Sequence, residues 1–125
     1  MKYLLDTNVC VVALRGKKPL VQARLTAHPP ADLAVCSVVV GELCVGAAKS
    51  HNPAAEQVKV DNFLAPFRSL PFDDTAARRY AEIRTHLEAL GTPISDLDMV
   101  IAAIALANNL ILVTHNTAEF SPSRG

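Results

Sequence analysis

The chain has 125 residues, of which half are apolar, so it is long enough for one compact domain with a buried core. Twelve basic residues balance twelve acidic ones, which excludes an overall basic surface as the basis for binding a polyanion. Tryptophan is absent and only 5% of the residues are aromatic, which argues against an aromatic platform that stacks single-stranded bases.

No apolar run approaches the roughly 20 residues that a membrane-spanning helix needs. The cysteines Cys10, Cys36 and Cys44 lie among valine, leucine and alanine, and no Cys-x-x-Cys pair is present. We interpret them as small buried hydrophobic residues in a reducing compartment. We therefore expect one cytoplasmic domain over residues 1–125 that does not bind a membrane.

Short apolar runs alternate with helical patterns along the chain. Runs typical of buried strands lie at residues 2–5, 33–36 and 110–113, and residues 68–71 are expected to be a short strand or an extended piece. Helical patterns lie at residues 8–14, 19–27, 38–49, 53–67, 75–90 and 97–108. Capping residues mark several helix starts, among them Ser37 and either Asp73 or Asp74. The alternation predicts an α/β fold with a central, mostly parallel sheet that helices cover on both faces.

Three acidic residues stand in apolar surroundings. Asp6 follows the first predicted strand, Glu42 lies in an apolar helical run, and Asp98 opens the apolar helix 97–108. Carboxylates are seldom buried unless they are paired or bound to a metal. Because ligands of parallel sheets bind beyond the carboxyl ends of the strands, we expect these acids to converge at that edge.

Each acid also has a purely structural explanation. Asp6 could serve only as a helix N-cap, and Glu42 could lie on a solvated helix face. Asp98 lies three residues after Ser95, which is the spacing of a capping box. Asp96 is the other candidate here. Two residues on a helix are rotated by about 200°, so Asp96 can join Asp98 only if it precedes the helix.

Acids gathered at one place repel each other unless a cation neutralises them. Oxygen ligands alone select a hard cation, Mg²⁺ or Mn²⁺. Such an ion activates water and stabilises charge on a scissile phosphate, so the predicted chemistry is hydrolysis by metal-bound water. The sequence contains no glycine-rich phosphate loop that would suggest a different mechanism.

Five segments, taken in order, resemble the PIN-domain family, and within it the VapC-type toxins of bacterial toxin–antitoxin pairs. The segments are Leu4–Asn8, Val40–Leu43, Gly91–Ile94, Asp98–Ala103 and Leu112–Phe120. The resemblance covers nearly the whole chain. It implies a PIN-like three-layer α/β/α sandwich and a Mg²⁺-dependent endoribonuclease, with Mn²⁺ able to replace Mg²⁺, that cleaves RNA and inhibits translation.

The resemblance also implies roles for single residues. Asp6, Glu42 and Asp98 match the family's acidic metal-binding residues, and Asp6 and Asp98 are the expected direct ligands. Asn116 stands where the family often carries a fourth acid, so Asp96 is a candidate for the missing charge. Contacts to water or phosphate are expected from Thr7, Asn8, Ser37 and Thr114.

The implied partners are an RNA substrate, a second copy of the chain in a homodimer, and a cognate antitoxin. The basic residues expected to hold the RNA backbone are Arg15, Lys17, Lys18 and Lys49. Because the sequence closes with Ser121–Gly125, we expect the family's last edge strand to be absent. A catalytically inactive PIN-like module that binds RNA or protein is the alternative, which Asn116 favours.

Overall fold

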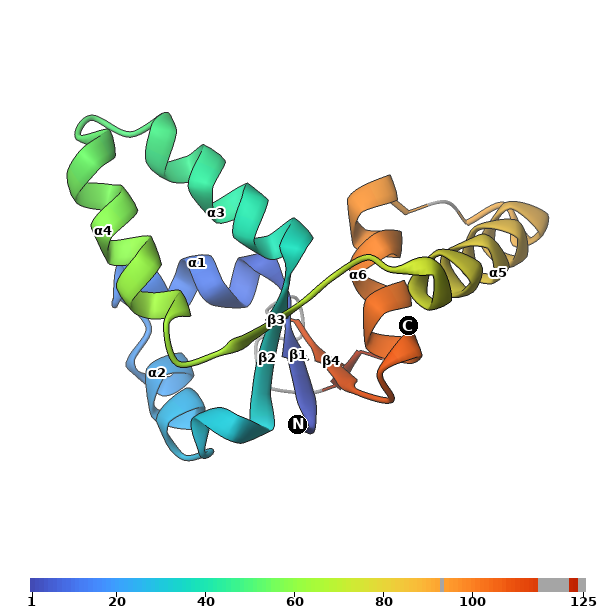
Figure 1. Ribbon diagram of the computed structural model, residues 1–125, viewed down its shortest axis with the longest axis horizontal. Coiled ribbons are helices and arrows are strands. Elements are labelled where there is room, and N and C mark those ends of the chain that lie inside the picture. Colours follow the sequence, from blue (N-terminus) through green and yellow to red (C-terminus); the bar gives the residue numbers. More distant parts are fainter. Residues whose placement is uncertain (93, 115–121, 124–125) are drawn as a thin grey trace.

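The sheet lies at the centre of the molecule, between two groups of helices (Figure 1). The computed structural model describes residues 1–92, 94–114 and 122–123. The strands are β1 (Tyr3–Leu5), β2 (Leu33–Cys36), β3 (Arg68–Leu70), β4 (Ile111–Val113) and β5 (Pro122–Ser123). The helices are α1 (Thr7–Arg15), α2 (Pro19–Thr26), α3 (Ser37–Ala48), α4 (Pro53–Leu64), α5 (Asp74–Leu90) and α6 (Asp96–Ala107), and a 3₁₀ turn, Pro30–Asp32, precedes β2.

The order of the strands in the sheet is β3-β2-β1-β4-β5. The first four strands are parallel, with Tyr3 of β1 paired to Leu33 of β2 and to Ile111 of β4. The predicted α/β fold with a mostly parallel sheet is therefore confirmed. Because parallel strands all point the same way, the helices α1 and α3 leave from one common edge of the sheet.

Helices α1 to α4 lie on one side of the sheet and α5 and α6 on the other (Figure 1). The central strand β1 is covered on both faces, so Leu4 and Leu5 are fully shielded from solvent. In the second helical layer, every residue of α6 from Ile101 to Ala105 is buried from solvent. No helix within the described ranges is long and apolar enough to cross a membrane.

The expectation that the last edge strand is absent is wrong. β5 pairs antiparallel with β4, with Val113 opposite Pro122 and Leu112 opposite Ser123. A short extended segment is sufficient, because it satisfies backbone groups that would otherwise be unpaired at the open edge of β4. Proline is tolerated in such an edge strand because its missing N–H is not needed for a further strand.

The assignment of Ser37 as a helix cap is also wrong. The N-cap of α3 is Cys36, whose backbone is still extended, and Ser37 is the first helical residue. The helix follows β2 without an intervening residue, so the cap position falls on the last strand residue. The Ser37 hydroxyl donates instead to the Leu70 carbonyl of β3, at 3.4 Å.

Candidate active site

Asp6 is held at the end of β1 by its backbone and by its side chain. Its backbone N–H donates to the Val113 carbonyl at 3.1 Å, which extends the pairing of β1 with β4 to the carboxyl edge. Its Oδ1 accepts the N–H of Val9 at 2.9 Å, so Asp6 is the N-cap of α1. The cap role considered for Asp6 is confirmed, and this cap fixes the half-buried carboxylate beside the end of the strand.

Glu42 lies in the second turn of α3 and is half-buried between the buried residues Val39 and Leu43. Its Oε1 accepts a hydrogen bond from the Thr7 hydroxyl at 2.5 Å, across 35 residues of sequence. That length is at the short end of the range for O–H···O hydrogen bonds. Glu42 is therefore not on a freely solvated helix face, because it is tied to the residue that follows Asp6.

Asp98 is the third residue of α6, and its side chain is exposed. Its backbone N–H donates to the hydroxyl of the N-cap Ser95 at 3.1 Å, as the capping-box spacing predicted. Figure 1 shows that α6 begins beyond the carboxyl edge of the sheet, on the side opposite to α3. Asp98 is thus carried by a third element, α6, and is more exposed than Asp6 or Glu42.

Asp96 does not lie ahead of the helix, because α6 begins at this residue. The rotation of about 200° between Asp96 and Asp98 therefore applies, and the two side chains diverge. Asp96 makes an ion pair with Arg84 of α5 at 3.4 Å, and its side chain is 70% exposed. Its carboxylate is thus directed to the neighbouring helix, and the condition under which Asp96 was expected to join Asp98 is not met.

Hydrogen bonds bring Asp6 and Glu42 together at the start of α1, while Asp98 lies in the first turn of α6. Across residues 1–92, 94–114 and 122–123, no three His, Cys, Asp or Glu side chains are close enough to hold a metal ion. In the same described ranges, neither Glu42 nor Asp98 forms an ion pair. Asn116 lies outside the described residues. Oxygen donors of this kind fit a hard divalent cation.

A model of the PIN domain matches residues 3–121 of the chain. The chain belongs to the PIN-domain family. It is 33% identical over 120 residues to the tRNA(fMet)-specific endonuclease VapC of Shigella flexneri, which covers 96% of this chain and 90% of that protein. It is 36% identical over 121 residues to ribonuclease VapC2 of Rickettsia felis, with the same shares covered. These relatives confirm the resemblance to the VapC-type members of the family.

Solved structures give the same result. The VapBC complex of Salmonella typhimurium bound to DNA superposes with a TM-score of 0.88 at 32% identity, and covers 96% of this chain and 90% of that one. VapBC2 of Rickettsia felis, bound to a promoter DNA fragment, gives a TM-score of 0.87 at 34% identity, with 94% and 90% covered. The PIN-like arrangement of sheet and helices is therefore confirmed.

Two buried thiols lie beneath the acids of this PIN domain. Burial raises the pKa of the Cys10 thiol, and the nearby charge of Asp6 raises it further. Burial also raises the pKa of Cys36, and Glu42 adds to that effect. All three cysteines are free, with Cys10 and Cys36 buried, as predicted, and Cys44 half-buried. The thiols of Cys10 and Cys36 therefore lose a proton less readily than an exposed cysteine does.

The basic residues expected to bind RNA lie away from the acids. Arg15 ends α1 and is followed by Lys17 and Lys18, and all three are exposed. Arg15 is eight residues beyond Thr7, or about 12 Å along the helix axis. Lys49 is the exposed C-cap of α3, seven residues beyond Glu42 and so about 10 Å from it along the axis. The structure thus places these cations one helix length from the acidic edge.

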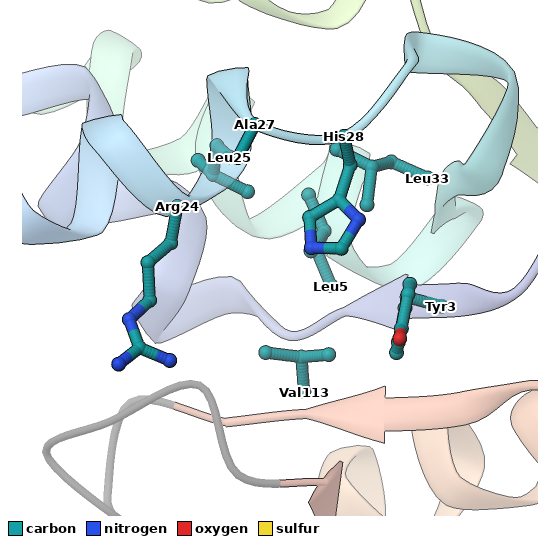
Figure 2. Close-up of a pocket in the computed structure, with 8 residues that line it drawn as sticks. All are labelled: Tyr3, Leu5, Arg24, Leu25, Ala27, His28, Leu33 and Val113. Carbon is teal, nitrogen blue, oxygen red and sulfur yellow. The ribbon is translucent and has the colours of Figure 1, made fainter.

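A cavity of about 380 Å³ lies beside α2, on the α1–α4 side of the sheet (Figure 2). Its walls are mostly apolar, with Leu5 and Val113 among them, and Arg24 and His28 add polar groups. The His28 ring lies 5.2 Å from the ring of Tyr3, measured between centroids. The three acids do not line this cavity, so it is separate from the candidate site.

Two contacts of the candidate site were not anticipated from the sequence, namely Thr7–Glu42 and Arg84–Asp96. Each contact joins two different elements, and the separation of its two residues in the sequence does not predict that they meet. Thr7 was expected to contact water or phosphate, yet its hydroxyl donates to a carboxylate. The only sequence signal for such a role is its place directly after Asp6.

Proposed function

We propose that this PIN domain is an endoribonuclease toxin that hydrolyses RNA phosphodiester bonds, inhibits translation and is neutralised by a cognate antitoxin. The proposal is supported by Asp6 at the end of β1, Glu42 bonded to the next residue Thr7, and Asp98 in the first turn of α6, in a chain 33% identical to a named tRNA(fMet)-specific endonuclease. The VapBC complexes among the solved relatives support the antitoxin as partner.

Asp6, Glu42 and Asp98 would hold one Mg²⁺, which Mn²⁺ could replace. Their oxygen donors come from three elements, and Glu42 and Asp98 make no ion pair in the described part of the chain that would neutralise them. When bound, the ion supplies an activated water molecule and stabilises charge on the phosphate. Asn116 would add an amide oxygen without adding charge.

Each acidic side chain has a separate role in the proposed site. Asp6 presents a carboxylate fixed by the α1 cap, and Asp98 presents one from the first turn of α6, where the helix dipole favours negative charge. Glu42, held through Oε1, has Oε2 to orient the attacking water. Asp96 would act on the placement of α6 through Arg84.

Arg15, Lys17, Lys18 and Lys49 would contact RNA phosphates beyond the cleaved bond, because they lie one helix length from the acids. Such contacts position a nucleic acid and carry no sequence information. We further propose that the protein acts in the cytoplasm as a homodimer.

The test is cleavage of total cellular RNA by antitoxin-free protein with Mg²⁺, with EDTA, and with the variant Asp98→Asn. The proposal predicts discrete fragments that require Mg²⁺ and wild-type protein. The first defined RNA to examine is tRNA(fMet), which the relative from Shigella flexneri is named for. If folded wild-type protein leaves every RNA intact, the chain is instead an inactive module that binds RNA or protein. If Asp98→Asn cuts equally well, the site assignment is wrong.

A further inference from the structure

We infer that Thr7 is a positioning residue for Glu42, whose hydroxyl fixes one carboxylate oxygen and leaves the other directed to the proposed reaction site. We base this inference on the 2.5 Å hydrogen bond from Thr7 Oγ1 to Glu42 Oε1. The inference rests on the proposed function and adds a residue to that same site.

The Thr7 hydroxyl leaves from a rigid point of the backbone. Thr7 is the first residue of α1 and follows Asp6, whose N–H is bonded to Val113 of β4 and whose carboxylate caps the helix. Thr7 and Glu42 are both half-buried, so water competes weakly for the bond between them. One short segment at the end of β1 therefore holds two acids, Asp6 directly and Glu42 through Thr7.

The two side chains differ in stiffness, and this gives the bond its effect. Threonine is branched at Cβ and has few χ1 rotamers, whereas glutamate has three rotatable torsions. A stiff donor bonded to a flexible acceptor fixes the acceptor. Groups that hydrogen-bond to metal-binding carboxylates orient them in this way, and their loss typically costs about 10–100-fold in metal affinity or activity.

The same bond argues against a direct contact of Thr7 with phosphate. A hydroxyl carries one hydrogen, and Thr7 already donates it to Glu42. Phosphate oxygens in a diester only accept hydrogen bonds, so Thr7 could bind one only by giving up Glu42. The hydroxyl can still accept a hydrogen bond from water while it holds the carboxylate.

The experiment compares Thr7→Val, which keeps the shape and removes the hydroxyl, with Thr7→Ser, which keeps the hydroxyl. We expect Thr7→Val to lose about 10–100-fold in kcat with an unchanged KM for RNA, and to lose Mn²⁺ affinity in calorimetry by a similar factor. Thr7→Ser keeps the hydroxyl donor but lacks the branch at Cβ, so it should retain most of the wild-type kcat and Mn²⁺ affinity. Thr85→Val is the matched control, because the Thr85 hydroxyl donates to the Ala81 carbonyl on exposed α5.

A second arm separates action through Glu42 from any other role. Thr7→Val should have no further effect on Mn²⁺ affinity or cleavage when Glu42→Ala, which removes the acceptor of the bond, is already present. An additional loss of the same size in that background would overturn the inference, as would wild-type behaviour of Thr7→Val. If Thr7→Val does not fold, Thr7→Ala is compared with Thr7→Ser in its place. The proposed function is tested separately by Asp98→Asn, so a failure of Thr7 alone leaves it standing.

Discussion

The carboxylates on the two sides of the acidic edge differ in burial and in the hydrogen bonds that restrain them. On the side of β1, α1 and α3, Asp6 and Glu42 are half-buried and each accepts a hydrogen bond from a group fixed at the start of α1. On the side of α5 and α6, Asp98 is exposed, and Asp96 is joined to Arg84 by an exposed ion pair. The first side is thus preorganised, whereas the position of Asp98 depends on the start of a single helix.

The largest expected difference between the two sides concerns stability. Leu5 is fully buried at the end of β1, so Leu5→Ala should lower the free energy of unfolding by about 2–5 kcal/mol. Leu97 on α6 is 48% exposed, and Leu97→Ala should change it by no more than about 0.5 kcal/mol. Urea unfolding monitored by circular dichroism measures both. Equal losses would show that the first turn of α6 is packed as tightly as the end of β1.

The buried thiols should make the first side sensitive to alkaline pH. The pKa values of Cys10 and Cys36 are raised in the folded protein, so above the ordinary value of 9.0 the unfolded chain loses protons that the folded one keeps. Stability is therefore fully present below pH 9 and falls above it, by up to about 1.4 kcal/mol per pH unit for each thiol.

Urea unfolding at pH 7, 9 and 10 measures this slope, and the double variant Cys10→Ala/Cys36→Ala is the control. The difference between wild type and control isolates the thiols from the lysines and tyrosines that titrate in the same range. Parallel pH dependences in the two proteins would contradict the assignment.

A smaller effect is expected at the start of α6. Ser95→Ala removes the side chain that accepts the Asp98 N–H and should cost about 0.5–2 kcal/mol of stability. Ser95→Asn keeps a capping oxygen and should cost little. If the cap also places Asp98, cleavage activity falls in Ser95→Ala and is retained in Ser95→Asn. Equal activity in the two variants would show that Asp98 does not depend on its cap.

The smallest effect is expected for the ion pair between α5 and α6. Arg84→Gln removes the cation that pairs with both Asp96 and Glu88, and all three side chains are exposed, so the thermal midpoint should barely move. A large drop in the thermal midpoint would mean that Arg84 holds α5 and α6 together. The ion pair would then stabilise this side of the edge more than its exposure indicates. Differential scanning calorimetry at low and high salt measures the change.

Local patterns in the sequence were sufficient for most of the fold. The apolar run at residues 33–36 coincides with β2, and Asp73, one of the two predicted caps, accepts the Ala76 N–H at the start of α5. Ser37 failed as a cap because α3 starts directly from the strand, a property of the junction that composition does not encode. The edge strand β5 was missed because pairing at a sheet edge depends on the neighbouring strand as well as on the residues themselves.

The candidate site was predictable only in part. Asp6 and Asp98 stand out because they adjoin apolar runs, and the structure confirms that both lie at helix starts. The bond between Thr7 and Glu42 spans 35 residues and requires the pairing of β1 with β2 before the two side chains can meet. Contacts of this kind depend on tertiary packing, so no local pattern reveals them.

We propose that acids from both sides of the edge bind one metal ion. The most direct test is the Mn²⁺ affinity of antitoxin-free protein, measured by isothermal titration calorimetry for wild type, Asp6→Asn, Asp98→Asn and Asp73→Asn. Asparagine retains the N-cap at Asp6 and at the control position Asp73, where the carboxylate only caps α5. We predict that Asp6→Asn and Asp98→Asn each weaken binding more than about 10-fold, while Asp73→Asn binds like the wild type. Undiminished binding by folded Asp98→Asn would contradict the claim.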